Sequence, residues 1–172
     1  CAPYPDCNGT PITAEANQDD DNCPDCLESS ETAVYDTGYM GCYNNGDLAF
    51  LQALIDNSPD GENNPPSSLS PWKLGHQLWE NKRLTTFCCS SSSWDLSTFP
   101  QWSGSNCQSE CPYEFGTTIP SNIENLTALG TLALAGMSLE GTIPDGLTDL
   151  VALDVLVLIG NENLSGSLPE SI

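Results

Sequence analysis

Carboxylates and cysteines are crowded together near the start of the chain. The acidic run 17–22 is followed directly by the Cys-Pro-Asp-Cys segment 23–26. Oxygen ligands at alternating positions can hold Ca²⁺. The candidate calcium ligands are the side chains of Asp19, Asp20, Asp21 and Asp25. The simpler interpretation is a solvated acidic loop, in which case a chelator leaves the stability of the protein unchanged.

Other side chains suggest catalysis only weakly. A Cys-x-x-Cys pair can bind zinc or exchange disulfides, but no second Cys/His pair follows at ligand spacing, so structural disulfides are expected. His76 is the only histidine, and the serine-rich segment 88–94 contains no G-x-S-x-G motif. Because the sequence has neither paired acid and base groups nor an activated nucleophile, it predicts a protein that is not an enzyme.

The charge of the chain restricts its partners. Only Lys73, Lys82 and Arg83 are basic, against 24 Asp and Glu, which gives a net charge of −21 over 172 residues. This charge repels nucleic acids and anionic membranes. No run of 18 apolar residues is present, so no membrane span is expected. Basic proteins, calcium and neutral glycans remain as partners.

Cysteine usage indicates an oxidising compartment. The nine cysteines all lie between Cys1 and Cys111, and none lies in the leucine-rich C-terminal third. Three N-x-[ST] sequons, at Asn8, Asn125 and Asn163, predict N-linked glycans and agree with secretion to the cell surface or wall. The first residue is not Met, which fits either a removed signal peptide or a fragment.

The C-terminal third of the sequence contains a repeated leucine pattern, which determines where its side chains lie. Leucines at 126, 129, 132 and 134 recur 24 positions later, and the tail 139–144 matches 164–169 at an offset of 25. The segment GTTIP at 116–120 is an earlier copy of that tail. In each copy the L-x-L pair places alternate side chains of a short strand in a core. One copy cannot bury its apolar face alone, so the copies must stack.

Residues 116–172 resemble the plant-type leucine-rich repeat family, whose copies also carry a G-x-I-P tail. The resemblance implies an α/β solenoid: a short repeat stack with a disulfide-stapled helical N-terminal cap and an irregular Cys-rich extension. Cys42, the Cys88-Cys89 pair and the W-x-G-x-x-C segment 102–107 look like the family's cap. By this resemblance Cys42 pairs with Cys88, and Cys89 with Cys107. The pairing of Cys1, Cys7, Cys23, Cys26 and Cys111 stays open.

Three regions follow from these features. Residues 1–41 are an acidic Cys-rich extension, 42–115 the cap, and 116–172 the repeats, incomplete at the C-terminus. Within the cap, a helical stripe in 42–60 has Asp47 as a candidate N-cap, and the apolar spacing in 71–83 predicts a second helix.

Side chains between the repeat leucines alternate away from the core, onto the concave face of the predicted stack. This apolar strip is a candidate protein-binding face. Its members are Thr131, Ala133, Ala135, Val155, Val157 and Ile159. Alternatively, glycans, the cap or further repeats cover it. On the second strand, Thr118, Thr142 and Ser167 form a small polar ladder, which fits either an ice-binding surface or a strand next to a turn.

The last copy breaks off at Ile172, although a stack needs its end covered. Either the sequence is a fragment, or another molecule covers that end. Two functions are therefore expected. The first is a secreted glycoprotein that recognises a protein or glycan through its repeats. The second is a self-associating structural subunit of an extracellular filament or matrix.

Overall fold

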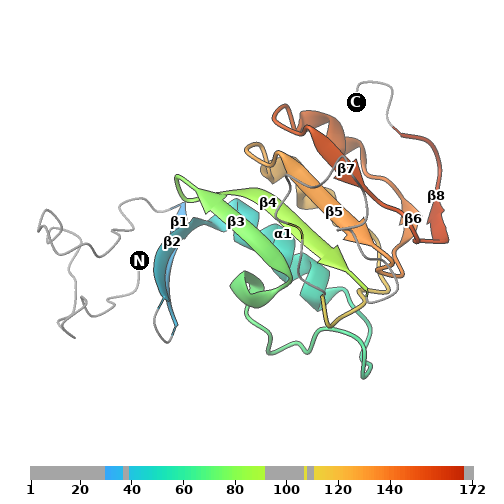
Figure 1. Cartoon of the computed structure of the whole chain (residues 1–172), viewed down its shortest axis with the longest axis horizontal. Helices are drawn as coiled ribbons and strands as arrows, with labels where there is room; N and C mark the ends of the chain where they lie inside the picture. Colours follow the sequence, from blue (N-terminus) through green and yellow to red (C-terminus); the bar gives the residue numbers. More distant parts are fainter. Residues whose placement is uncertain (1–29, 37–38, 92–106, 108–110, 169–172) are drawn as a thin grey trace, which may run out of the picture. The chain divides into compact units, whose positions relative to one another are not determined.

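The computed structural model describes residues 30–36, 39–91, 107 and 111–168. The chain divides into two compact units, Cys1–Asn45 and Gly46–Ile172. In the described part of the first unit, β1 (Glu31–Asp36) and β2 (Tyr39–Asn44) pair antiparallel (Figure 1).

The second unit is built on a four-stranded mixed sheet in the order β3-β4-β5-β7 (Figure 1). Its strands are β3 (His76–Glu80), β4 (Arg83–Ser90), β5 (Thr131–Ala135) and β7 (Val155–Val157). β3 and β4 form an antiparallel hairpin, whereas β4, β5 and β7 are parallel. A separate parallel pair consists of β6 (Glu140–Thr142) and β8 (Asn163–Ser165). The short 3₁₀ helices of the described residues are η1 (Pro71–Lys73), η4 (Ser121–Asn125) and η5 (Asp145–Asp149).

The helix α1 (Asn45–Asp56) packs on one face of the main sheet (Figure 1). Leu51, Leu54 and Ile55 are buried at helical spacing in the main hydrophobic core. The Phe50 ring meets the Phe87 ring of β4 edge-on, with 6.4 Å between the centroids. The helix predicted within 42–60 is therefore confirmed. No helix among the described residues has the length and apolar character needed to cross a membrane.

Asp47 is not the N-cap, because the helix begins two residues earlier. Its carboxylate is fully buried and accepts hydrogen bonds from Nε and Nη2 of Arg83, both at 2.9 Å, and from the backbone N–H of Leu84 at 2.8 Å. The hydrogen bond to Asp47 raises the pKa of Arg83 above its ordinary value, against the desolvation that lowers it, so the guanidinium stays charged.

Arg83 also reaches beyond this pair. Its Nη2 donates to the backbone carbonyl of Asn125 at 2.7 Å, and its Nη1 donates to Oγ1 of Thr127 at 3.2 Å. One guanidinium thus ties α1 and β4 to the end of η4, where the first repeat copy begins.

The repeat spacing appears directly in the strand pairing. In the β5–β7 ladder, Thr131 lies opposite Val155 and Leu132 opposite Leu156, which is an offset of 24. In the β6–β8 ladder, Gly141 lies opposite Leu164, an offset of 23 where the sequence alignment has 25. A shift of two residues keeps each side chain on the same face, since the period of a strand is two.

Asn161 fixes the turn after β7 against the turn after β5. Its Oδ1 accepts hydrogen bonds from the backbone N–H groups of Met137 and Leu139, at 2.9 and 3.1 Å. Its Nδ2 donates to the carbonyls of Leu134 and Leu158, at 2.7 and 2.9 Å. Asn161 is buried and Leu134, Met137 and Leu139 are 0% exposed, so three of these bonds satisfy backbone groups of fully buried residues.

The predicted solenoid is wrong. The described residues form a small α/β domain with one α-helix and small mixed sheets. Only β5 and β7 of the main sheet come from the aligned copies, and the other two strands are an antiparallel hairpin from a segment that does not repeat. A stack of at least three like units is what makes a repeat architecture.

The predicted helix at 71–83 is also wrong, because this segment forms η1, β3 and the start of β4. Gly75 has a φ of +61° and allows close approach, since a Cβ there would lie 2.7 Å from the carbonyl oxygen of Cys88. Asn81 and Lys82, at φ values of +48° and +67°, form the hairpin loop. Positive φ at both central residues is typical of a type I′ turn.

We expect Arg83→Met to lower the free energy of unfolding by roughly 3–5 kcal/mol, because it leaves the buried Asp47 charge without its partner. Urea unfolding followed by circular dichroism measures this loss. The double variant Asp47→Asn/Arg83→Met should be more stable than Arg83→Met alone, since Asn can still accept from Leu84 N–H. A single-variant loss below about 1 kcal/mol would show that the pair is dispensable.

Asn161→Leu should lower the free energy of unfolding by at least about 2 kcal/mol, because it removes the acceptor of two backbone N–H groups. Thermal unfolding of the unglycosylated protein measures the change. The control is the exposed Asn163→Gln, for which no change is expected. Equal melting temperatures for all three proteins would contradict this role of Asn161.

Candidate functional site

The core is incompletely covered at one end of the second unit. Leu126, Leu129, Leu132, Leu134 and Leu139 of the first copy are all 0% exposed. Of their counterparts in the second copy, Leu150 is 4% exposed, whereas the other four are only partly buried. We call the surface formed by those four leucines, Leu153, Leu156, Leu158 and Leu164, together with the outer edges of β7 and β8, the end face.

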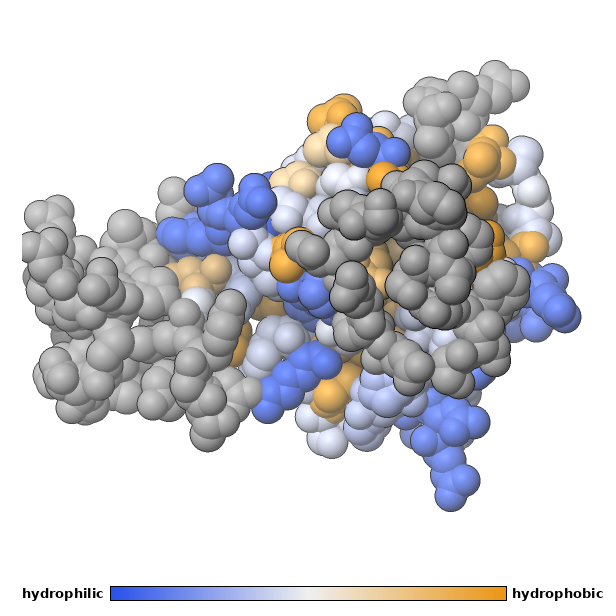
Figure 2. Space-filling view, in the orientation of Figure 1, coloured by the Kyte–Doolittle hydropathy of each residue, from blue (hydrophilic) through white to orange (hydrophobic). Residues whose placement is uncertain are grey.

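Two further features mark the end face. Among the described strands, β7 pairs only with β5, and β8 only with β6, so an edge of each sheet is unpaired there. Val151, in the turn before β7, is 89% exposed. Figure 2 shows hydrophobic surface in the upper right of the view, over the end of the unit that carries β7 and β8.

The rim of the end face is acidic. Asp149 at the end of η5, Asp154 just before β7 and Glu162 just before β8 are exposed. No Lys or Arg occurs anywhere in residues 84–172. An apolar centre with carboxylates around it can bind a surface that has an apolar centre and basic residues around it.

The predicted concave residues do come together on one face of the main sheet, opposite the face that carries the leucines. His76, Cys88, Ala133 and Val157 lie in one row straight across the four strands. The pair Thr131 and Val155 lies in the next row, and Ala135 and Ile159 belong to the same face.

This face is accessible only in part. Ala133 and Ala135 are 0% exposed and Val157 is 4% exposed. They pack with the buried sulfur-bearing side chains of Cys88 and Cys107. Three of the six predicted binding residues are therefore core residues, and only Thr131, Val155 and Ile159 remain partly exposed.

The disulfide pairing implied by the family resemblance is wrong. Cys88 bonds to Cys107 and Cys89 to Cys111. Cys42 is also disulfide-bonded, but its partner is not Cys88. Side chains of neighbouring residues in a strand point to opposite faces. This explains why Cys88 joins the cluster with Cys107, whereas Cys89 and Cys111 lie in the leucine core.

The small polar ladder is exposed, as Thr118, Thr142 and Ser167 all reach the surface. A Cβ on Gly141 would lie 3.0 Å from the Thr118 methyl group, and one on Gly166 3.6 Å from the Thr142 methyl group. The glycine of each G-x-[IL]-P tail thus lies against the threonine of the preceding copy. Ice binding by this ladder stays a prediction.

Other predicted sites are placed as follows. The sequon residues Asn125 and Asn163 are exposed. Asn8 and the calcium candidates Asp19, Asp20, Asp21 and Asp25 lie outside the described residues. Within the described ranges no three His, Cys, Asp or Glu side chains gather as a metal site. His76 is half-buried, and its Nε2 is buried without a hydrogen-bond partner in the described part of the chain.

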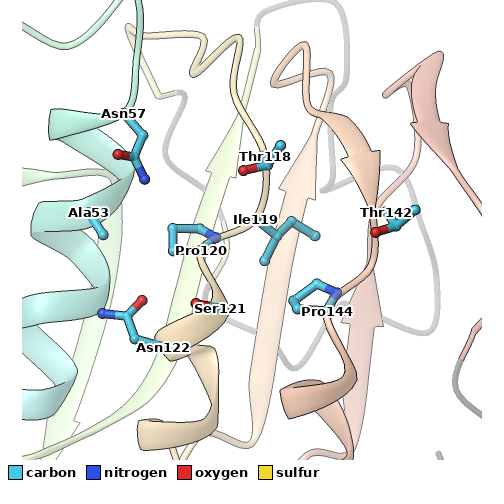
Figure 3. A pocket seen from close by; sticks show the side chains of 9 residues that line it. All are labelled: Ala53, Asn57, Thr118, Ile119, Pro120, Ser121, Asn122, Thr142 and Pro144. Atoms are coloured by element: carbon cyan, nitrogen blue, oxygen red, sulfur yellow. The ribbon is translucent and has the colours of Figure 1, made fainter.

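Sequence reasoning missed a groove of about 510 Å³ beside α1 (Figure 3). It runs from the end of α1 across residues 118–122 to β6 and Pro144. The repeat spacing already groups Thr118 with Thr142, but nothing in the sequence places Ala53 and Asn57 of the α1 segment beside them, because that segment does not repeat.

No family model, no curated protein and no solved structure matches this chain. The resemblance to plant-type leucine-rich repeat proteins therefore stays a prediction.

The disulfide pairing can be tested with variants that remove one bond at a time. Cys89→Ser/Cys111→Ser should add no free thiol in denaturant, because the bond between Cys88 and Cys107 stays intact. Thiol titration with a chromogenic disulfide measures this. Cys89→Ser/Cys107→Ser is the matched control and should release the thiols of Cys88 and Cys111. The opposite pattern would support the pairing of Cys89 with Cys107.

Proposed function

We propose that this protein is a non-enzymatic extracellular binding protein that holds another protein on the end face of residues 46–172. The supporting observation is the difference in burial between matched leucines. Leu132 and Leu134 are 0% exposed, whereas Leu156 and Leu158 are only partly buried. Covering this apolar surface is favourable, since it removes it from water.

The chemistry of the partner follows from the surroundings of those leucines. The unpaired edges of β7 and β8 offer backbone N–H and C=O groups to an added extended segment. Exposed Asp149, Asp154 and Glu162 favour Lys and Arg on the partner. The partner is therefore a basic protein that presents an apolar extended segment. The disulfides favour an oxidising, extracellular location.

A structural subunit is the second candidate. The open edges of β7 and β8 would also let copies of the chain add to one another, and an end-to-end contact that does not close gives a filament. The net charge of −21 opposes such self-association at low ionic strength. Light scattering of the glycosylated protein separates the two functions, since a binding protein stays a small particle and a structural subunit forms large assemblies.

A zero-length cross-linker that joins carboxylates to lysines tests the proposed surface. Applied to the native extracellular fraction, it should couple Asp149, Asp154 or Glu162 to lysines of a partner, as read by mass spectrometry. Val151→Asp should weaken this coupling roughly tenfold, because it places a charge beside the apolar surface, while the fold persists at an 89% exposed position.

The matched control is Ala49→Asp, which adds the same charge at an exposed position of α1 and should leave the coupling unchanged. Cross-links that map instead to Asp60 and Glu62, or coupling that survives Val151→Asp, would count against the end face. Cross-links only between copies of this chain would favour the structural subunit.

A further inference from the structure

The sequon at Asn163 lies on the outermost strand of the smaller sheet. Asn163 is the first residue of β8 and pairs with Glu140 of β6. Among the described strands, β8 has no neighbour on its other side, so its outer edge is one of the two open edges of the end face (Figure 1). A glycan attached to this strand would therefore lie where another strand can otherwise add.

The side chain of Asn163 is available for that modification. Asn163 and Ser165 are exposed, whereas Leu164 between them packs against the leucine core, so Asn163 points away from the core. Its amide makes no hydrogen bond within the described residues. The hydroxyl of Ser165 donates to the carbonyl of Gly141 at 3.0 Å. A glycan on Asn163 thus breaks no contact that the described fold uses.

The surface next to β8 is apolar as well as open. The residue before the proline of each G-x-[IL]-P tail is Ile119, Ile143 and Leu168 in turn. Ile119 is 5% exposed and Ile143 is partly buried, whereas Leu168 is 54% exposed. The exposure of this position therefore rises toward the end face, as it does for the repeat leucines. An open strand edge beside an exposed apolar side chain is a surface on which copies of a chain can pair.

The two copies carry their sequons at different places. The first-copy sequon, Asn125-Leu-Thr127, aligns at an offset of 24 with Asp149-Leu-Val151. The second copy thus has an exposed carboxylate and the 89% exposed Val151 where the first copy has its sequon. Its own sequon lies on β8 instead. The side of the end face next to β7 therefore has no glycan acceptor, and the side next to β8 has one.

We propose that an N-linked glycan on Asn163 shields the edge of β8, which prevents copies of the chain from pairing there and leaves the edge of β7 for a partner. The inference rests on the proposed function, because it assigns one closed and one open edge to the end face. The bulky, hydrated sugars exclude a second backbone from β8, while Val151 and Leu156 stay accessible. The glycan thereby favours a binding protein over a self-associating subunit.

The modification itself is a transfer of an oligosaccharide to the amide nitrogen. Nδ2 of Asn163 forms a bond to the anomeric carbon of the oligosaccharide, which is carried on a lipid pyrophosphate. The lipid pyrophosphate leaves as that bond forms, and the nitrogen loses one proton. Peptide mass spectrometry of the secreted protein should therefore find a glycan on Asn163.

The effect of the glycan is tested on full disulfide-bonded chains secreted from a eukaryotic host. Wild type is compared with Asn163→Gln and with the matched control Asn125→Gln, which removes the glycan of the first copy. Light scattering in about 0.3 M salt, where the Debye length falls to about 6 Å, limits the repulsion between the acidic copies. Asn163→Gln should self-associate with a constant at least roughly tenfold higher than that of wild type, and Asn125→Gln should behave like wild type.

Two further measurements locate the contact. In concentrated Asn163→Gln, the backbone amides of 163–168 should exchange with deuterium more slowly than in the dilute protein. The double variant Asn163→Gln/Leu168→Asp should return to the small particle of wild type, because it places a charge beside the edge at a 54% exposed position.

Three results would overturn the proposal: no glycan on Asn163 in the secreted protein, equal particle masses for wild type and Asn163→Gln, or slowed exchange that maps away from 163–168. None of them alters the cross-links of Asp149 and Asp154 to a basic partner, so the proposed function can survive this failure. Conversely, self-association of Asn163→Gln through β8 without any partner cross-link would support the shielding and contradict the binding protein.

Discussion

The buried carboxylate of Asp47 is the constraint on which the arrangement of residues 46–172 depends. A fully buried charge is very costly unless a counter-charge and hydrogen bonds compensate it. Arg83 supplies both in a two-pronged contact, and Leu84 N–H adds a third bond. The guanidinium then has donors left for the backbone of Asn125 and the hydroxyl of Thr127. One ion pair therefore orients α1, sets where β4 starts, and anchors the segment that leads into β5.

The hydrophobic core extends from this ion pair toward the second copy, and its leucines become less completely buried along the way. The leucines of the first copy are sealed between α1, β4 and the second copy, whereas those of the second copy have a neighbour on one side only. The second copy completes the burial of the first. The leucines of the second copy are therefore the residues whose burial would gain most if another surface covered them.

The side-chain amides of Asn122 and Asn161 differ in how far the fold satisfies their hydrogen-bonding groups. The Asn161 side chain bonds to backbone groups from both turns, and its amide is fully satisfied. Asn122 keeps a buried oxygen with no donor in the described residues. An asparagine that completes a backbone network is explained by the fold alone.

The sequence by itself determined the local periods. The leucine spacing predicts the offset of 24 between β5 and β7, and the apolar stripe predicts α1, because both follow from side chains that share one face of one element. Tertiary contacts decided the rest. The apolar spacing of 71–83 suits a helix, but the left-handed Gly75 and the Asn81–Lys82 turn make it a hairpin. Which cysteine meets Cys88 depends on the face toward which it points, and whether Ala133 is a binding or a core residue depends on what covers it. The period of a sequence pattern shows which residues share one face of a helix or strand. Burial and pairing depend instead on segments that are distant in sequence and meet only in the folded chain.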